Sequence, residues 1–304
     1  MKIAFFTEMG FHGKVSREHP NMRTEFAWMS ALDADHYNLR STPLMQYDLG
    51  IVIIPKKDPS FDINVLKQYC NKVAVMQEGP SWYWQDYNLN KQIWYYNTLI
   101  DSDIIFTHNQ SDKKYYQGLT NHKDVRVMPS LMIEDAIGTV AQTERKDVII
   151  GGNFVSWYGG FDSMIVAQEL SDTIWAPSMG RKQLGEEQLI KHLPYLEWKD
   201  WIHKLNEFKY GVHLMRTHAA GTFALNCAYL GIPCIGYKGL DTQEILHPEL
   251  TVELGDLQTA KELAKKIRLD EEFYLYLSNK AKTLYLENYT EVKFKEKFKE
   301  KFNI

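Results

Sequence analysis

Cysteine is scarce in this sequence: Cys70, Cys227 and Cys234 are the only three among 304 residues, and no two have the C-x-x-C spacing. An odd number without such pairs predicts reduced core thiols in a cytoplasmic protein, not a disulfide framework. Positive charge is limited as well, because 35 Lys and Arg face 39 Asp and Glu, for a net charge of -4. This balance excludes a general nucleic-acid-binding surface, so contact with a nucleic acid requires a local basic patch.

Long apolar segments and clustered metal ligands are absent too. No run approaches the ~20 apolar residues of a membrane span, and the apolar run at the N-terminus is too short for a signal peptide. No His/Asp cluster has the spacing of a metal site. We therefore expect a cytoplasmic protein that has no membrane span and needs neither a metal nor a resident cofactor.

Apolar strands alternate with helices along the first half of the chain. The predicted strands are residues 2–7, 48–55, 72–76, 103–107 and 124–128, and the predicted helices are 21–32, 63–70 and 90–100. Continuously apolar strands of this kind are typical of a parallel sheet with helices on both faces.

The alternation pauses between residues 129 and 146 and then resumes. Strands are predicted at 147–150, 173–175, 195–197, 210–214 and 233–236, with helices at 161–170, 186–192 and 199–207. We therefore predict an α/β protein of two doubly wound domains, residues 1–135 and 146–270, that face each other across a cleft. Residues 271–304 are helical and charged, with one apolar stripe of Phe294, Phe298 and Phe302, and are predicted to pack back on the N-terminal domain.

Two loops that follow strands of the second half have small residues where a ligand could approach. The first, GGNFVSWYGG at residues 151–160, places paired glycines after a strand, which lets backbone approach a phosphate; a flexible turn is the alternative. In the second, HAAGTFALNCAYLGIPCIGY at 218–237, Gly221 and Thr222 begin a helix whose N–H groups favour an anion. Close helix packing explains these small residues equally well.

These segments resemble the glycine loop and the donor-site segment of the retaining nucleotide-sugar glycosyltransferases of the GT-B fold. The resemblance covers most of the second half and is carried by GGNFVSWYGGFDSMIVAQEL and HAAGTFALNCAYLGIPCIGYKGLDTQEIL. It implies two Rossmann-like domains, a UDP-sugar donor and retention at the anomeric carbon. The implied donor-binding residues are Gly152, Asn153, Tyr158, His218, Gly221, Thr222, Asn226 and Glu244.

The sequence departs from the family's pattern at charged positions. His218 and Asn226 stand where the family has two glutamates, and Asn153 and Tyr158 where it has the Arg and Lys that neutralise the diphosphate. We expect the missing positive charge to come from Arg181 and Lys182 or from Arg216, which lie in loops after predicted strands. An exposed surface cation is the alternative for each of the three.

The predicted acceptor side uses loops after N-terminal strands. His12 lies between flexible glycines, and Glu78 and Asp86 flank an aromatic run, so these three are candidate catalytic residues. Trp82 and Trp84 could stack on a sugar or a base, with Lys14 as an acceptor-binding cation. Lys14, Arg17, Arg23, Lys56 and Lys57 form a local positive set. A structural histidine and a core role for the aromatics are the alternatives.

The N-terminal segment FHGKVSREHPNMRTEFAWMSALDADHY is similar to glycosyltransferases encoded by tailed phages. That resemblance implies, as acceptor, a hydroxymethylated pyrimidine flipped out of phage DNA; a glycan or a small molecule is the alternative. We thus predict a metal-independent glycosyltransferase with a nucleotide-sugar donor. A degenerate nucleotide-binding module without catalysis and a sugar-nucleotide epimerase are its rivals.

Overall fold

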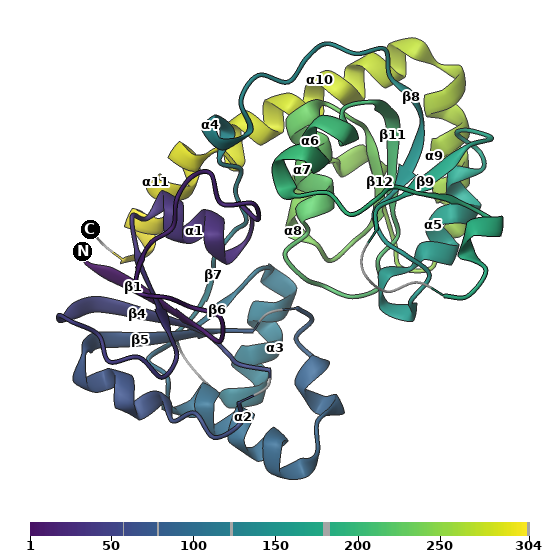
Figure 1. Cartoon of the computed structure of the whole chain (residues 1–304). Helices are drawn as coiled ribbons and strands as arrows, with labels where there is room; N and C mark the ends of the chain where they lie inside the picture. The colour runs from purple at the N-terminus through teal and green to yellow at the C-terminus, as the bar shows by residue number, and fades with distance from the viewer. Residues whose placement is uncertain (57, 78, 122–123, 179–182, 303–304) are drawn as a thin grey trace.

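The chain forms two α/β lobes that face each other, as Figure 1 shows for the computed structural model, which describes residues 1–56, 58–77, 79–121, 124–178 and 183–302. Each lobe has a mainly parallel sheet between helices. The predicted fold class, two Rossmann-like doubly wound domains around a cleft, is confirmed.

The first lobe is built on a seven-stranded sheet of order β2-β3-β1-β4-β5-β6-β7. Neighbouring strands are parallel except β2 and β3. Strand order reverses beside β1, between β3 and β4, which is where doubly wound sheets bind ligands. The strands are β1 Ile3–Thr7, β2 Gly13–Lys14, β3 Asp35–Asn38, β4 Tyr47–Ile53, β5 Cys70–Met76, β6 Ile104–Thr107 and β7 Val125–Val127. The helices are α1 Glu25–Ala31, η1 Ile63–Gln68, η2 Tyr83–Asp86, α2 Leu89–Asp101 and α3 Gln110–Thr120.

The second lobe has a six-stranded sheet of order β10-β9-β8-β11-β12-β13, parallel throughout. Its order reverses between β8 and β11, so the loops after these two strands border the expected ligand crevice. The strands are β8 Lys146–Ile150, β9 Ile174–Ala176, β10 Lys191–His192, β11 Phe208–His213, β12 Cys234–Tyr237 and β13 Thr251–Val252. The helices are η3 Ser156–Tyr158, α5 Gly160–Ala167, η4 Glu186–Gln188, α6 Trp198–Leu205, α7 Thr222–Leu230, α8 Asp241–Leu246, η5 Pro248–Leu250 and α9 Leu257–Leu269.

Two local predictions were wrong. The helix predicted at 186–192 is a single 3₁₀ turn, η4, followed by strand β10. The strand predicted at 195–197 is absent because Pro194 ends the pairing: Leu193 still donates its N–H to Ala176, but a proline has no N–H to continue.

The lobes are joined by a connector, residues 128–145, which contains α4 Glu134–Ile137, and by the C-terminal helices α10 Glu271–Asn288 and α11 Glu291–Phe302 (Figure 1). Helix α10 packs on α7, α8 and α9 of the second lobe. Helix α11 lies on the first lobe, where Phe302 meets Phe106 at 6.0 Å and Arg17 donates to the Glu291 carboxylate at 2.7 Å. None of the described helices is long and apolar enough to cross a membrane.

Candidate active site between the lobes

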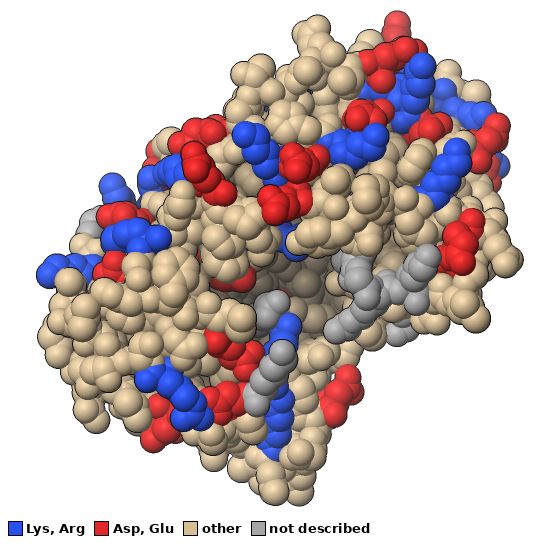
Figure 2. All heavy atoms as spheres, viewed as in Figure 1, with Lys and Arg blue, Asp and Glu red and all other residues tan. Residues whose placement is uncertain are grey.

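Two adjoining cavities lie between the lobes, in the hollow that Figure 2 shows. The interlobe cavity, of about 300 Å³, is lined by both lobes. The second-lobe cavity, of about 390 Å³, is lined mainly by the second lobe. Both are lined by Asn21, Arg23, Gly151, Tyr158, Thr222 and Phe223. One elongated ligand can therefore occupy both.

The interlobe cavity lies where the carboxyl ends of the two sheets face each other. Ile53 ends β4, Met76 ends β5 and His108 follows β6 in the first lobe. Gly151 follows β8 and His213 ends β11 in the second. The cavity therefore occupies the crevice in which two doubly wound domains are expected to bind their ligand.

The start of α7 forms part of the wall shared by the cavities. Gly221 precedes the helix with φ +64°, and a Cβ there would lie 2.0 Å from the Thr242 hydroxyl oxygen. Close packing thus requires glycine at 221. Thr222 begins the helix, and no side chain caps it. The first N–H groups and the helix dipole are consequently available to an anion in the cavity. Packing thus accounts for Gly221, and anion binding at this helix start stays a prediction.

The second-lobe cavity combines aromatic rings with one buried amide. Tyr195, Trp198 and Trp201 line it, and flat aromatic faces suit a nucleobase. Asn226 lines it too, with 4% of its surface exposed. No described residue hydrogen-bonds the Asn226 amide, so the amide is available to a ligand hydroxyl.

Arg23 is the cation that the structure places at both cavities. Its Nε donates to Asn21 at 2.6 Å, and it forms no ion pair with a described residue. Arg216 lines neither cavity; it binds Asp162 at 2.8 Å, and this hydrogen bond raises the pKa of Arg216. Arg181 and Lys182 lie outside the described residues. The sequence predicts Arg23 only as a member of the local positive set in the first half of the chain, not as a donor-site residue.

The glycine loop contributes one side chain to the cavities. Tyr158 lines both, and Gly152 lets it approach, since a Cβ at 152 would lie 2.7 Å from the Tyr158 Cβ. Asn153 is buried, with its side-chain Oδ1 accepting the N–H of Val155 at 3.2 Å, and lines neither cavity.

His218 and Glu244 lie where the lobes meet, outside both cavities. His218 Nδ1 is 2.9 Å from the Ser111 hydroxyl oxygen of the first lobe, and its ring packs on Gly239. Glu244 accepts the N–H of Gly239 at 2.7 Å. Of the two positions where the resembled family has glutamates, only Asn226 reaches a cavity.

The predicted acceptor residues are dispersed over the first lobe, and none of those described lines either cavity. His12 is exposed and stacks on Tyr37 at 4.9 Å. Lys14 pairs with Asp33 and Asp35 at the outer edge of the sheet. Trp84 is buried against Tyr95, whereas Trp82 is partly exposed and Asp86 exposed. Glu78 lies outside the described residues; its neighbours Gln77 and Gly79 line the interlobe cavity.

Sequence reasoning missed His108 and His213, which line the interlobe cavity. Burial lowers the pKa of each to about 4. Both histidines could have been proposed from the sequence, because each lies at the carboxyl end of a predicted strand, where doubly wound sheets bind ligands.

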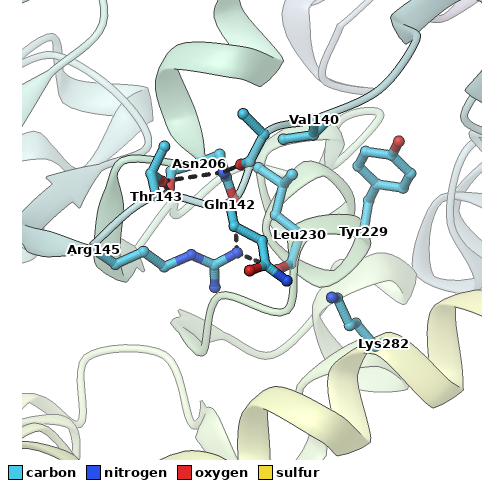
Figure 3. A pocket seen from close by; sticks show the side chains of 9 residues that line it. Val140, Gln142, Thr143, Arg145, Asn206, Tyr229, Leu230 and Lys282 are labelled. Carbon is cyan, nitrogen blue, oxygen red and sulfur yellow. Dashed lines mark hydrogen bonds between the residues drawn. The ribbon is translucent and has the colours of Figure 1, made fainter.

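A third cavity, of about 520 Å³, lies behind α7 and is lined by the connector, α7 and α10 (Figure 3). Its arginine, Arg145, donates to the carbonyl oxygens of Leu230 and Gly231 and to Asn206. The guanidinium therefore caps the C-terminal end of α7. We regard this cavity as structural, since its arginine is already bound and it lies at the opposite end of α7 from the cleft.

No family model and no curated protein matches the chain. Solved structures do match it. The HepE protein of Anabaena in complex with UDP and glucose has a TM-score of 0.70 and 10% identity, over 100% of this chain and 99% of that one. Sucrose-phosphate synthase from Thermosynechococcus elongatus has a TM-score of 0.67 and 9% identity, over 100% of both chains. TarM has a TM-score of 0.64 and 8% identity, over 84% of this chain and 55% of that chain. The present chain therefore spans about half the length of TarM. At these identities the likeness concerns the fold: this chain has the two-lobed architecture of GT-B glycosyltransferases.

Proposed function

We propose that the chain is a glycosyltransferase that moves a sugar from a UDP-sugar to an acceptor hydroxyl. The observation that carries the proposal is the pair of joined cavities at the facing sheet ends, with the start of α7 and Arg23 in their shared wall. Two of the similar structures support it, since HepE was solved with UDP and with UDP-glucose.

The cavities suggest how the donor lies. The base and ribose occupy the second-lobe cavity, where aromatic rings flank the base and Asn226 bonds a ribose hydroxyl. The diphosphate lies against the α7 N-terminus and Arg23, and the sugar enters the interlobe cavity. In the reaction the acceptor oxygen bonds to the anomeric carbon, while the bond from that carbon to the diphosphate oxygen breaks. The proton of the acceptor hydroxyl passes to the departing diphosphate. Arg23 and the Thr222 N–H stabilise the charge that develops on departing UDP.

For the acceptor we favour a glycan or small molecule. The basic rim expected for DNA is partly neutralised, because Lys14 pairs with Asp33 and Asp35, and Arg17 with Asp135 and Glu291. Figure 2 likewise shows acidic and basic side chains intermingled around the hollow. The prediction of a hydroxymethylated pyrimidine as acceptor rests only on the resemblance of the N-terminal segment to phage glycosyltransferases. Retention at the anomeric carbon, metal independence and Glu78 as base remain predictions.

The test is UDP release from UDP-sugars, with and without simple glycosides and hydroxymethylated DNA. We expect release that rises with an acceptor. Arg23→Gln should weaken UDP binding about tenfold, the loss of one charge-assisted contact of ~1.4 kcal/mol. Arg40→Gln, which removes the same charge from a pair with Asp58 on the first lobe, should not weaken it.

Three results would contradict the proposal. Tight UDP binding without turnover of any UDP-sugar would favour a degenerate binding module. Interconversion of UDP-sugars without an acceptor would favour an epimerase. Equal UDP affinities of the Arg23 and Arg40 variants would remove Arg23 from the donor site.

A further inference from the structure

Two histidines from opposite lobes line the interlobe cavity and have no part in the donor scheme above. His108 follows β6, and His213 is the last residue of β11. Since both sheets direct their carboxyl ends at the cleft, the two residues line one cavity from opposite lobes.

His213 is held by packing and has no polar partner. Its ring lies edge-on to Phe223 at 5.3 Å, and a Cβ at Gly151 would lie 2.5 Å from its Cγ, so the glycine leaves room for the imidazole. The residue is 6% exposed, and neither Nδ1 nor Nε2 has a hydrogen-bond partner among the described residues. Buried polar atoms in folded proteins are seldom left in this state.

His108 is packed in a similar way, although its side chain is partly exposed. Its ring stacks on Trp28 at 5.4 Å, and Trp28 is itself fixed by a 2.9 Å hydrogen bond from its Nε1 to the carbonyl oxygen of Pro129. The buried Nδ1 of His108 has no described partner. Both rings are therefore rigidly placed and have free hydrogen-bonding capacity beside the cavity.

The chemistry at this part of the cavity suits an uncharged polyol. Burial keeps both imidazoles neutral, with a pKa of about 4, so each offers one donor and one acceptor. The charged side chains of the cavity, Arg23 and Glu25, come from the segment at the start of α1. Ile53, Met76 and Met215 add apolar surface. A hexose has alternating hydroxyl groups and apolar C–H faces to match.

We propose that His108 and His213 hold the transferred sugar from the two lobes by hydrogen bonds to its hydroxyl groups, and so select an uncharged hexose. The inference rests on the proposed function, since it presumes that the donor's sugar occupies the interlobe cavity. It assigns two specificity-determining residues to that cavity and makes sugar binding depend on both lobes.

The test compares UDP, UDP-glucose and UDP-glucuronate as calorimetric ligands of the full chain. His108→Phe and His213→Phe keep an aromatic ring and remove the nitrogens. Because no described residue hydrogen-bonds these nitrogens, neither variant should lower the thermal midpoint. Each should weaken UDP-glucose about tenfold and leave UDP within twofold, and the wild-type chain should prefer UDP-glucose to UDP-glucuronate.

A second pair of variants keeps the outcome decisive if a Phe variant folds poorly. His108→Gln and His213→Gln retain a donor and an acceptor, and should keep more UDP-glucose affinity than the Phe variants. Unchanged UDP-glucose affinity in all four variants, or equal weakening of UDP and UDP-glucose, overturns the inference and leaves the proposed function intact. A wild-type chain that binds no UDP-sugar overturns both.

Discussion

At the scale of single residues, two buried asparagines of the second lobe differ in their surroundings. Asn206 is fully engaged: its Nδ2 donates to the Ala141 carbonyl at 2.8 Å, and its Oδ1 accepts from Arg145 at 2.7 Å. Asn226 is as deeply buried but is hydrogen-bonded by no described residue. Because Asn226 lines the second-lobe cavity, its amide is available to a ligand there.

This contrast yields a matched pair of variants. Asn226→Leu should weaken UDP binding about tenfold, by the loss of one ribose contact of ~1.4 kcal/mol, while the free energy of unfolding stays level or rises. Asn206→Leu removes one of the three acceptors of Arg145 and the amide that donates to the Ala141 carbonyl, and should lower the free energy of unfolding by about 2 kcal/mol with UDP affinity unchanged. Calorimetry and urea denaturation measure both. Loss of stability without loss of affinity in Asn226→Leu would contradict the assignment.

At the scale of elements, the N-termini of α3 and α8 meet across the lobes and cap each other. The Asp241 carboxylate accepts the N–H of Gln110 at 3.1 Å, at the start of α3. In return, Asn109 accepts the N–H of Asp241 through its Oδ1 at 3.0 Å. Two positive helix ends repel, so a carboxylate between them stabilises the contact. Burial nonetheless raises the pKa of Asp241.

Reciprocal capping predicts coupling between the two residues. Asn109→Ala and Asp241→Ala should each lower the free energy of unfolding by about 1–2 kcal/mol, and the double variant by clearly less than the sum. The control pair is Asn109→Ala with Asp270→Ala, because Asp270 caps only its own helix through the N–H of Phe273. That pair should be additive. Additive losses in Asn109/Asp241 would show that the lobes are not joined through these caps.

Helices and strands could be predicted from the sequence where their buried residues form a local apolar run. The continuously apolar β1, β4 and β8 were found in this way. By contrast, β3 has the polar sequence DHYN and is a strand because it pairs with β1, and α3 has the polar sequence QSDKKYYQGLT. The cavity residues follow the same division. Thr222 and Asn226 lie on a helix that the sequence predicts, whereas His218 is placed by its contact with Ser111 of the other lobe, which no local pattern reveals.

At the scale of the whole molecule, buried neutral histidines connect stability to pH. His36, His108, His213 and His247 come from both lobes, and burial lowers the pKa of each to about 4 from an ordinary 6.5. The folded chain therefore binds protons less readily than the unfolded chain between these values. Their contribution to stability is fully present above pH 6.5 and is lost as the pH falls toward 4. Asp112 and Asp241, whose pKa burial raises, act in the opposite direction.

The wild-type free energy of unfolding should accordingly decline between pH 6.5 and pH 4. His213 and His247 each contribute up to about 1.4 kcal/mol per pH unit. Urea denaturation of His213→Phe across this range isolates one of them: the variant should match or exceed the wild-type stability at pH 7 and lose less of it by pH 4. An unchanged slope would mean that His213 is protonated in the folded chain, and a cationic ring there would favour an anionic group in the interlobe cavity over a neutral sugar.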